Sequence, residues 1–419
     1  MCKCLEYLFW CLEVPSSQRT AREELESIVW INDPDTAYRL AKVVEQRGDK
    51  LVVGFRDENG FYEKRTVLAA DTQSPSLSYY VEDLCNLSEL TDANVLHAIR
   101  CRYESQLIHT YSGLFCVVVN PWRNLAIYSE DIMHEYANAL DRSSNLPPHI
   151  YAVAQSAYDG LFNGPNQSIL ITGESGAGKT ENTKKIIEYL GFEARRRSGV
   201  ERNGNGADKR LAAANFIIES FANASTIHNS NSSRVGKFIR IDFGEDMQLK
   251  GAQIQCYLLE KSRVVSQNEG DRNFHIFYQL FSEGFSEGVR YGMGLGQSAD
   301  AYRFLNQGGK TADRDINDEK CAYGTEHALD VVGFSEEEKL QIYETVASCV
   351  LLGEIKFHER SGLDITYVDG KKEVEAACRS LGVKTSRFID ALTAPSMKVG
   401  DTVIKKSQNL RKVTKPFIY

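Results

Sequence analysis

The sequence lacks the features that mark several specialised classes of protein. Its ten cysteines include no C-x-x-C pair and no regular spacing, which excludes a disulfide framework and is typical of reduced thiols in a large cytosolic protein. No apolar run approaches the roughly 18 residues that a membrane-spanning helix needs. The net charge of −8 argues against a general nucleic-acid-binding surface. Heptads and internal repeats are absent as well. From the net charge and the missing apolar run, we expect no nucleic-acid partner and no membrane span.

The composition that remains is that of an ordinary globular chain. Hydrophobic residues make up 42% and charged residues 25% of the 419 positions, and this length allows about two or three domains. Residues 1–24 form an atypical N-terminal extension, in which the apolar run Leu5–Val14 is interrupted by Glu6 and Glu13. We interpret this run as a short helix or strand that packs on the body, or as a stray segment. A signal peptide is the alternative, although no clean cleavage site follows.

Residues 25–75 have the pattern of a small β-barrel. Short β-branched or alternating stretches are separated by turn residues such as Glu58-Asn59-Gly60. The polar linker Asp71–Ser78 ends this module. The strands are expected at 29–31, 38–45, 50–55 and 63–68.

From about Tyr79 onward, longer helical patterns alternate with short apolar stretches. The continuous apolar character of residues 114–120 and 167–172 predicts strands that are buried on both faces. A helix follows the second stretch, with Ile186, Ile187 and Leu190 on one face. This alternation predicts an α/β domain with a mixed central β-sheet and surrounding helices.

Two further segments complete the pattern. An acidic turn, Gly244-Glu245-Asp246, joins stretches at 237–243 and 252–259, which are expected to pair as strands. Arg195–Lys209 contains charge, glycine and asparagine without apolar periodicity, which predicts a solvated surface loop.

The strongest chemical pattern is a phosphate-binding loop of the form G-x-x-x-x-G-K-[ST] between a predicted strand and a predicted helix. Its glycines let backbone N–H groups turn toward phosphate oxygens, and the helix offers its positive end. Lys179 would reach the β- and γ-phosphates of a nucleotide, and the Thr180 hydroxyl would bind Mg²⁺. ATP and Mg²⁺ are therefore the expected ligands. The loop consists of Gly173, Glu174, Ser175, Gly176, Ala177, Gly178, Lys179 and Thr180.

A second polar segment, Asn229–Arg234, lies between a predicted helix at 216–223 and the strand at 237. It supplies hydroxyls for metal and water, an amide for phosphate oxygens and a cation, which are the groups that a γ-phosphate sensor needs. A Ser/Asn-rich turn without ligand is the alternative. The N-x-x-S-S-R spacing, some fifty residues after the phosphate loop, favours the sensor.

Together these motifs resemble a myosin heavy chain motor head. GESGAGKT followed by Glu181 and Asn182 is similar to the phosphate loop of myosins, and N-x-x-S-S-R is similar to their first switch loop. Collinear stretches such as Thr110–Pro121 and Leu258–Val264 agree, so the resemblance covers about residues 25–412 and is closest to conventional, class II heads. It implies a partial P-loop NTPase motor domain at 79–413, preceded by a Src-homology-3-like barrel.

The resemblance also implies roles for single residues. Lys179 and Asn229 would contact phosphate oxygens, Ser232 would orient the attacking water, and Ser233 would be a second ligand of Mg²⁺. Arg234 would pair with a glutamate on a second switch loop. Asn120 and Pro121 would begin the purine-pocket segment, with Tyr128 placed to meet the adenine, and Trp122 either covers the base or simply packs in the core. Glu181 and Asn182 extend the nucleotide site.

The second switch of the family, D-x-x-G-F-E, has no clear counterpart. Asp330–Phe334 matches its first part, but Ser335 follows where the glutamate is expected. We interpret Ser335 as the N-cap of a helix, with Glu338 completing a capping box. The chain is therefore expected to stop before the second switch, and residues 414–419 diverge from the family pattern. A natural short isoform that acts as a nucleotide- or actin-interacting module is the alternative.

The resemblance implies an actin-activated ATP hydrolase of the cytoplasm and cytoskeleton. Its partner would be filamentous actin, with light chains and a second heavy chain in the full-length parent. Turn chemistry near Val399–Thr402 predicts a projecting hairpin, and in myosins a loop at this place touches actin. Lys398 and Thr402 would lie in it, with Thr402 at a position that is acidic or phosphorylatable in the family. An ordinary exposed threonine is the alternative.

Overall fold

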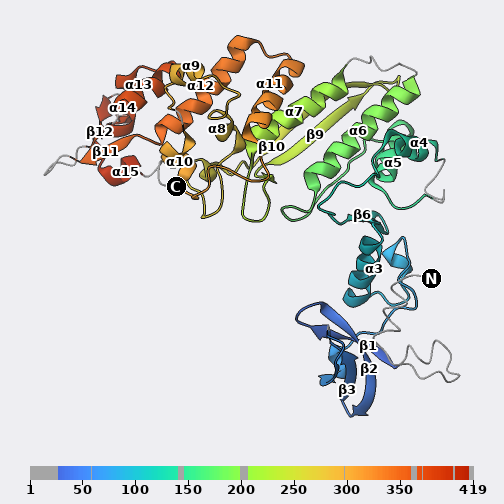
Figure 1. The fold of residues 1–419 in the computed structure, drawn as a ribbon. Coiled ribbons are helices and arrows are strands. Elements are labelled where there is room, and N and C mark those ends of the chain that lie inside the picture. Colours follow the sequence, from blue (N-terminus) through green and yellow to red (C-terminus); the bar gives the residue numbers. More distant parts are fainter. Residues whose placement is uncertain are drawn as a thin grey trace. The chain divides into compact units, whose positions relative to one another are not determined.

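The computed structural model describes residues 27–57, 59–139, 146–198, 206–296, 298–359, 366–369, 371–399 and 402–414. The chain divides into two compact units, Met1–Leu170 and Ile171–Tyr419 (Figure 1). The predictions for residues 1–24 and 415–419 lie outside the described residues. Within the described ranges, no helix combines the length and the apolar character that crossing a membrane requires.

The first unit begins with a four-stranded antiparallel sheet in the order β1-β2-β3-β4. Its buried side chains alternate along the strands, as Leu51, Val53 and Phe55 do in β3, so one face carries the core. The strands match the predicted stretches. They are β1 (Ile28–Asp33), β2 (Ala37–Arg47), β3 (Lys50–Arg56) and β4 (Tyr62–Leu68).

The predicted barrel is not closed. After β4, the chain makes a 3-10 turn at Ala69–Asp71 and returns to β1 only at Gln73. There the backbone groups of Trp30 and Gln73 exchange hydrogen bonds of 2.8 and 3.1 Å. Because no ladder joins β4 to β1 within the described residues, the structure shows an open sheet where the strand count predicted a barrel.

Helix α3 connects this sheet to the rest of the first unit. The Thr91 side chain caps the helix by accepting a hydrogen bond from the Asn94 backbone, and the buried face of α3 packs on Trp30 and Tyr79. The remaining elements are a hairpin and two helices. In order, these elements are α3 (Asp92–Glu104), β5 (His109–Ser112), β6 (Phe115–Val118), α4 (Glu130–Asn138) and α5 (Ile150–Asn163).

Two predicted strands depart from the structure. In the stretch 114–120, only Phe115–Val118 forms a strand, and Leu114 and Phe115 are 88% and 74% exposed. Residues 167–172 form no strand, and Leu170 is exposed. A buried strand needs ladder partners on its edges. In the described residues, β6 has one partner, β5, and residues 167–172 have none, so no mixed central sheet is formed there.

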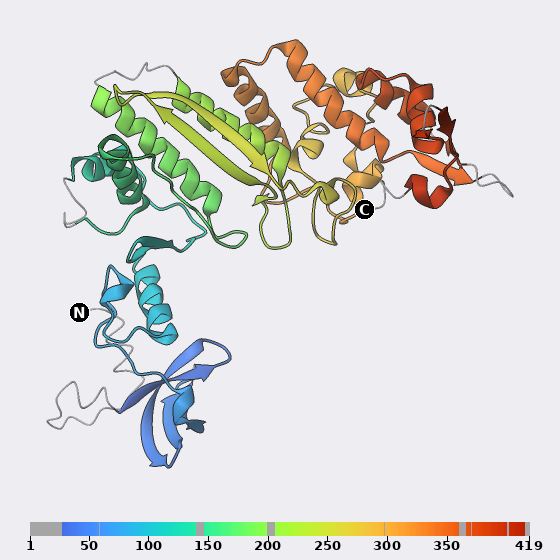
Figure 2. The ribbon, with the colours of Figure 1, turned by 180° about the vertical axis from the view of Figure 1, so that it is seen from behind.

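In the second unit, two long helices run alongside a long β-hairpin (Figures 1 and 2). Ile186, Ile187 and Leu190 are buried on α6, as the helical period predicts. The hairpin confirms the expected strand pair, with Ile239 opposite Ile254. These elements are α6 (Lys179–Ser198), α7 (Ala207–Ala222), β9 (Gly236–Phe243) and β10 (Leu249–Tyr257).

The loop predicted at Arg195–Lys209 is partly helical. Helix α6 continues to Ser198, and α7 begins at Ala207, whereas residues 199–205 lie outside the described ranges. The carboxylate of Glu193 is fully buried and accepts hydrogen bonds of 2.6 Å from both Arg196 and Arg197. Pairs at i,i+3 and i,i+4 stabilise a helix without any apolar periodicity, which explains why the prediction was wrong at this end.

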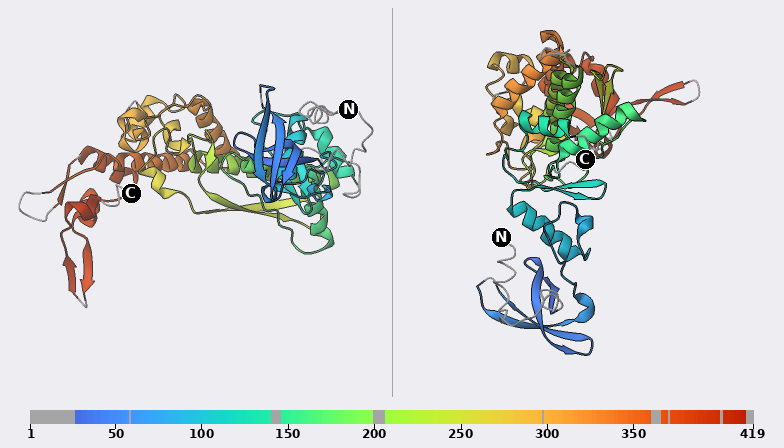
Figure 3. Two further views of the ribbon diagram at one scale, coloured as in Figure 1. Left: turned by 90° about the horizontal axis from the view of Figure 1, so that it is seen from below. Right: turned by 90° about the vertical axis from the view of Figure 1, so that its right-hand side faces the viewer.

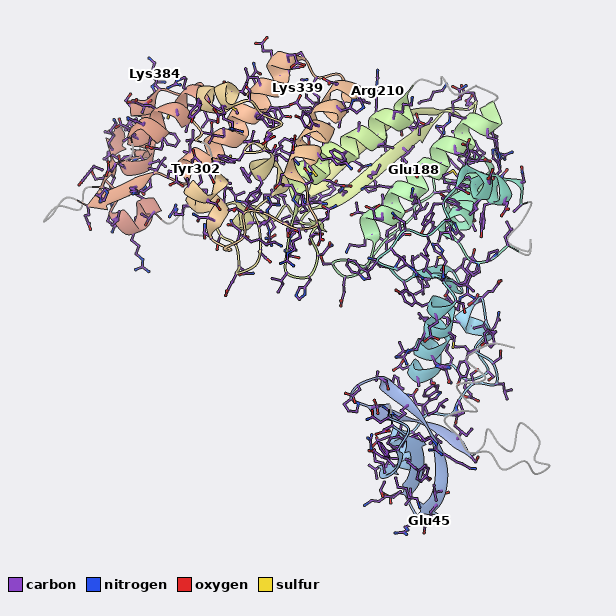
Figure 4. All side chains as sticks on the ribbon, viewed as in Figure 1. Glu45, Glu188, Arg210, Tyr302, Lys339 and Lys384 are labelled. Atoms are coloured by element: carbon purple, nitrogen blue, oxygen red, sulfur yellow. The ribbon has the colours of Figure 1, made fainter. Side chains whose placement is uncertain are left out.

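A helical body follows, and its core contains Phe277, Leu280 and Leu351. Ser335 and Glu338 form the predicted capping box at the start of α12. Lys339 lies where α11 and α12 meet (Figure 4), within 3.1 Å of Glu326, Asp330 and Glu336. The helices are α8 (His275–Gln279), α9 (Glu287–Gly292), α10 (Arg303–Asn306), α11 (Asp318–Val332) and α12 (Glu336–Leu352).

The last part of the second unit carries two hairpins. The hairpin β13–β14 projects from its surroundings (Figure 3). The elements are β11 (Lys356–Glu359), β12 (Thr366–Asp369), α13 (Lys371–Ser380), α14 (Thr385–Thr393), β13 (Ser396–Val399), β14 (Thr402–Lys405) and α15 (Leu410–Thr414).

Candidate functional site

The predicted phosphate loop lies directly before α6, so its backbone stands at the positive end of a 20-residue helix. Gly173, Gly176 and Gly178 have φ angles of 153°, 81° and 96°, which side chains rarely adopt. A Cβ atom on Gly173 would also approach the Ala177 Cβ to 3.1 Å. The loop is further tightened by a 3.2 Å bond from the Ala177 N–H to the Glu174 carbonyl. Glycine is therefore required where the loop turns.

The first helical turn holds the polar groups of the loop. The Lys179 ammonium is exposed and donates to the carbonyl oxygens of Gly173 and Glu174, at 2.6 and 2.8 Å. Asn182 donates its side-chain amide to the Gly178 carbonyl at 2.9 Å. The Asn182 amide oxygen is buried and has no hydrogen-bond partner among the described residues. The ammonium and the backbone at the start of the helix are the groups of this turn that can meet phosphate oxygens.

Thr180 and Glu181 follow Lys179 in the same turn. Thr180 is half-buried, and Glu181 pairs with Lys184 at 3.0 Å. Lys184 also reaches Glu219 on α7 at 3.1 Å. The turn that follows the loop is thus tied to the neighbouring helix by an ion pair.

The segment Asn229–Arg234 reaches the phosphate loop through the side chain of Ser232. Its strand β8 (Ser232–Ser233) pairs with β7 (Asn223–Ala224), which directly follows α7. The Ser232 hydroxyl is buried and lies 2.9 Å from the hydroxyl of Ser175. The structure therefore brings together two motifs that lie 57 residues apart in the sequence.

Asn231 fixes the middle of this segment. Its side-chain oxygen accepts from Asn223 at 2.9 Å and lies 3.1 Å from the His275 Nε2. Burial, together with the charge of Arg272, lowers the pKa of His275 to about 4. The imidazole is therefore neutral near pH 7, and its Nε2–H donates to the side-chain oxygen of Asn231. Sequence reasoning did not find His275, although it lies in the stretch FHIFYQ.

Asn229 and Ser233 have local partners. The Asn229 side chain accepts from the Asn231 N–H at 3.0 Å, and the Asn229 backbone pairs with Thr226. The Ser233 hydroxyl donates to the Val235 carbonyl at 3.2 Å, which leaves its oxygen lone pairs available. Both side chains therefore belong to the turn as well as to the proposed site.

Arg234 has a partner that the sequence analysis missed. Its Nε donates to Glu260 at 2.6 Å, and its Nη1 donates to Ser232 at 3.3 Å. The expected glutamate of a second switch loop is not the partner among the described residues. Instead the chain turns after β10 and brings the carboxylate of Glu260 to Arg234. No local pattern in the sequence pairs Glu260 with Arg234, because the two residues lie 26 positions apart.

The four predicted adenine-site residues belong to the first unit, whereas the phosphate loop begins the second. The Asn120 side chain accepts from the Trp122 N–H at 3.0 Å, and Trp122 has a φ of 51°. Trp122 is 69% exposed, so core packing, its alternative role, does not apply in this structure. The Tyr128 hydroxyl lies 3.5 Å from His109, and burial raises the pKa of Tyr128 to about 12. Pro121 joins Asn120 to Trp122.

The predicted hairpin near residue 400 is present. Val399 pairs with Thr402 and Lys398 with Val403, and Gly400 and Asp401 lie outside the described residues. Lys398 and Thr402 are exposed, far along the chain from the phosphate loop. The hairpin is attached to α14 by an ion pair between Lys405 and Asp390 at 2.8 Å.

The chemistry of the donor set fits a nucleotide with a hard cation. Among the described residues, no cluster of three or more His, Cys, Asp or Glu side chains could hold a metal ion by itself. Hydroxyl oxygens of Thr180 and Ser233, combined with phosphate oxygens, are ligands that Mg²⁺ prefers. A cation at this place would thus arrive with the phosphates.

Comparison with known proteins agrees with this chemistry. The family model for the myosin head (motor domain) matches residues 81–416. Myosin-3 of Caenorhabditis briggsae is 37% identical over 392 residues, which is 92% of this chain and 20% of that protein. Myosin-3 of Caenorhabditis elegans is 37% identical over 391 residues, with the same shares. The chain thus spans about a fifth of the length of these relatives. The chain belongs to the myosin head (motor domain) family.

Proposed function

We propose that this chain binds Mg-ATP at the phosphate loop and Asn229–Arg234, as part of an actin-based motor ATPase. The observation that carries the proposal is the 2.9 Å contact between the hydroxyls of Ser175 and Ser232. It brings a helix-opening glycine loop and a polar sensor segment to one place, which is the arrangement that phosphoryl transfer requires.

Each residue has a role that its contacts allow. Lys179 exchanges the carbonyls of Gly173 and Glu174 for the β- and γ-phosphates, and Asn182 supports the same helical turn through its hydrogen bond to the Gly178 carbonyl. Thr180 and Ser233 supply the hydroxyl ligands of Mg²⁺. Asn229 contacts phosphate oxygens, Ser232 orients the attacking water, and Arg234 pairs with a glutamate of a second switch loop. The other seven proposed site residues are Gly173, Glu174, Ser175, Gly176, Ala177 and Gly178 on the loop and Glu181 in the helix that follows it.

The wider proposals follow from the family. The parent protein hydrolyses ATP, binds filamentous actin, works in the cytoskeleton and associates with light chains and a second heavy chain. Asn120, Pro121, Trp122 and Tyr128 form the adenine site, and the sheet β1–β4 is the small module that precedes the motor domain. The hairpin with Lys398 and Thr402 contacts actin. A form that binds nucleotide or actin without motor activity is the second candidate.

Titration of the purified chain with a fluorescent ATP analogue and Mg²⁺ tests the nucleotide site. We expect Lys179→Ala to weaken binding by about 30-fold, since two charge-assisted hydrogen bonds to phosphate are lost and solvent replaces part of them. Lys185→Ala is the matched control, because Lys185 lies on the same helix and pairs with Glu188 at 2.8 Å. Equal affinities for the wild type and Lys179→Ala would refute the site.

A further inference from the structure

Two hydrogen bonds join Glu260 to Arg234, one between backbone groups and one between side chains. The Glu260 N–H donates to the Arg234 carbonyl at 3.0 Å, and the Arg234 Nε donates to the Glu260 carboxylate at 2.6 Å. The Arg234 N–H donates in turn to the Ala222 carbonyl, at the end of α7, at 2.9 Å. Arg234, the last residue of the segment Asn229–Arg234, is therefore hydrogen-bonded both to Glu260 and to the end of α7.

The carboxylate of Glu260 is itself held by a buried cation. Arg263 donates to it from Nε at 2.7 Å, and the Arg263 side chain is only 4% exposed. Arg263 also donates to the Arg272 carbonyl at 2.9 Å and to Asp271 at 3.2 Å. The second oxygen of Asp271 accepts from the Ile227 N–H at 3.1 Å, just before the sensor segment. The chain of contacts thus runs from Arg234 at the end of the segment to Ile227, two residues before its start.

Charge is balanced in this group, because two guanidinium groups face two carboxylates. Partial burial alone would raise the pKa of Glu260, but the hydrogen bonds from Arg234 and Arg263 outweigh it and keep the pKa below its ordinary value of 4.5. The carboxylate is thus charged at neutral pH. Removal of its charge leaves Arg263 with Asp271, whereas Arg234 loses the carboxylate partner it has among the described residues.

We propose that Glu260 is a positioning residue for Asn229–Arg234, which holds Arg234 in place and thereby keeps Ser232 against Ser175. Arg234 uses Nε for Glu260 and Nη1 for Ser232, so a guanidinium edge remains for another carboxylate or for the charge of a γ-phosphate. Only the expected effect on nucleotide release rests on the proposed function. The positioning itself is a property of the chain without ligand.

Hydrogen exchange of the full chain, measured by mass spectrometry without nucleotide, tests the positioning. The reporters are the N–H groups of Arg234 and Glu260, both of which are hydrogen-bonded. We expect Glu260→Gln, which keeps the shape but removes the charge, to speed their exchange about fivefold, since a half-exposed ion pair of this kind contributes modestly. Glu45→Gln is the matched control, because Glu45 pairs with Arg47 at 2.8 Å at the sheet of the first unit (Figure 4).

The comparison with Arg234→Gln separates a specific pair from general loosening. If the pair carries the effect, each single variant speeds exchange locally and the double variant adds little. Unchanged exchange in Glu260→Gln, full additivity in the double variant, or equally faster exchange in the ladder of β9 and β10 would each overturn the proposal.

A nucleotide readout then follows on the same variants. Glu260→Gln is expected to release the fluorescent ATP analogue about fivefold faster, at an unchanged midpoint of thermal unfolding, since the charge acts through Arg234. An unchanged release rate would overturn the positioning role of Glu260. Faster release together with a lower midpoint of thermal unfolding would overturn it as well. A wild-type chain that binds no nucleotide refutes the proposed function alone, because the exchange experiment needs no nucleotide.

Discussion

A single buried amide connects the sheet of the first unit to α3, and its removal should cost much of that unit's stability. The Asn94 side chain is fully buried and makes five hydrogen bonds with partners from β1, the following linker and the approach to the helix. Its oxygen accepts from Trp30 Nε1 at 2.8 Å, Tyr79 OH at 3.0 Å and Ser76 N at 3.1 Å, and its nitrogen donates to the carbonyls of Glu89 at 2.8 Å and Ser74 at 2.9 Å.

The magnitude follows from these contacts. A net contribution of about 1 kcal/mol for each hydrogen bond gives about 5 kcal/mol as an upper value for Asn94→Ala. Water that enters the space left by the side chain restores part of this, so we expect a loss of about 3 kcal/mol in the free energy of unfolding. The Trp30 indole N–H is the group that would otherwise remain buried without a partner, whereas the Tyr79 hydroxyl still accepts from the Ser76 N–H at 3.0 Å.

Urea unfolding followed by tryptophan fluorescence measures this loss, because Trp30 is buried beside Asn94 and Trp122 is exposed. With an m-value of about 2 kcal/mol per molar urea, the midpoint should fall by about 1.5 M. Asn86→Ala is the control, since Asn86 is exposed in the same unit, and such a change usually stays within about 0.5 kcal/mol. A midpoint for Asn94→Ala within error of the control would refute the reasoning.

Two further predictions concern the second unit. His275 has a folded-state pKa of about 4, below its ordinary 6.5, so its contribution to stability is complete above pH 6.5 and is lost as the pH falls toward 4. Between pH 7 and pH 5, we expect this histidine to lower the free energy of unfolding by about 2 kcal/mol. The urea midpoint should then fall more steeply with decreasing pH in the wild type than in His275→Gln, and equal slopes would contradict this. In a complete motor head that carries this segment, Thr402→Glu should give higher actin-activated ATPase than Thr402→Ala at low salt, where screening is weakest, and coincident curves against actin would argue against it.

Local patterns predicted those elements whose causes are local. The capping box at Ser335 and Glu338 depends on two side chains three residues apart, and the structure confirms it. The apolar face of α6 depends on one helical period, and Ile186 and Leu190 are buried as expected. The phosphate loop depends on glycines at fixed offsets, and their positive φ angles give the reason for the residue type.

Elements that depend on distant partners were harder to predict. The apolar run at 167–172 was predicted to be a buried strand, but a strand exists only where another strand completes its ladder. The barrel prediction counted strands without knowing whether β4 would meet β1. The family pattern gave Arg234 a partner on a second switch loop, which the chain was not expected to contain, and it gave no sign that Glu260 reaches Arg234 through the turn after β10.

The contacts of Lys179 also determine what its substitution can measure. The ammonium donates to two carbonyls of its own loop, at 2.6 and 2.8 Å. Phosphate binding must therefore replace these two hydrogen bonds with new ones to phosphate oxygens. The carbonyl oxygens of Gly173 and Glu174 then accept hydrogen bonds from water instead. Because only the difference between the two sets appears in the affinity, the effect of Lys179→Ala reports an exchange and is smaller than the strength of the new contacts. The same removal deprives the ligand-free loop of its internal ammonium, so exchange at the N–H of Ala177 should rise even without ATP.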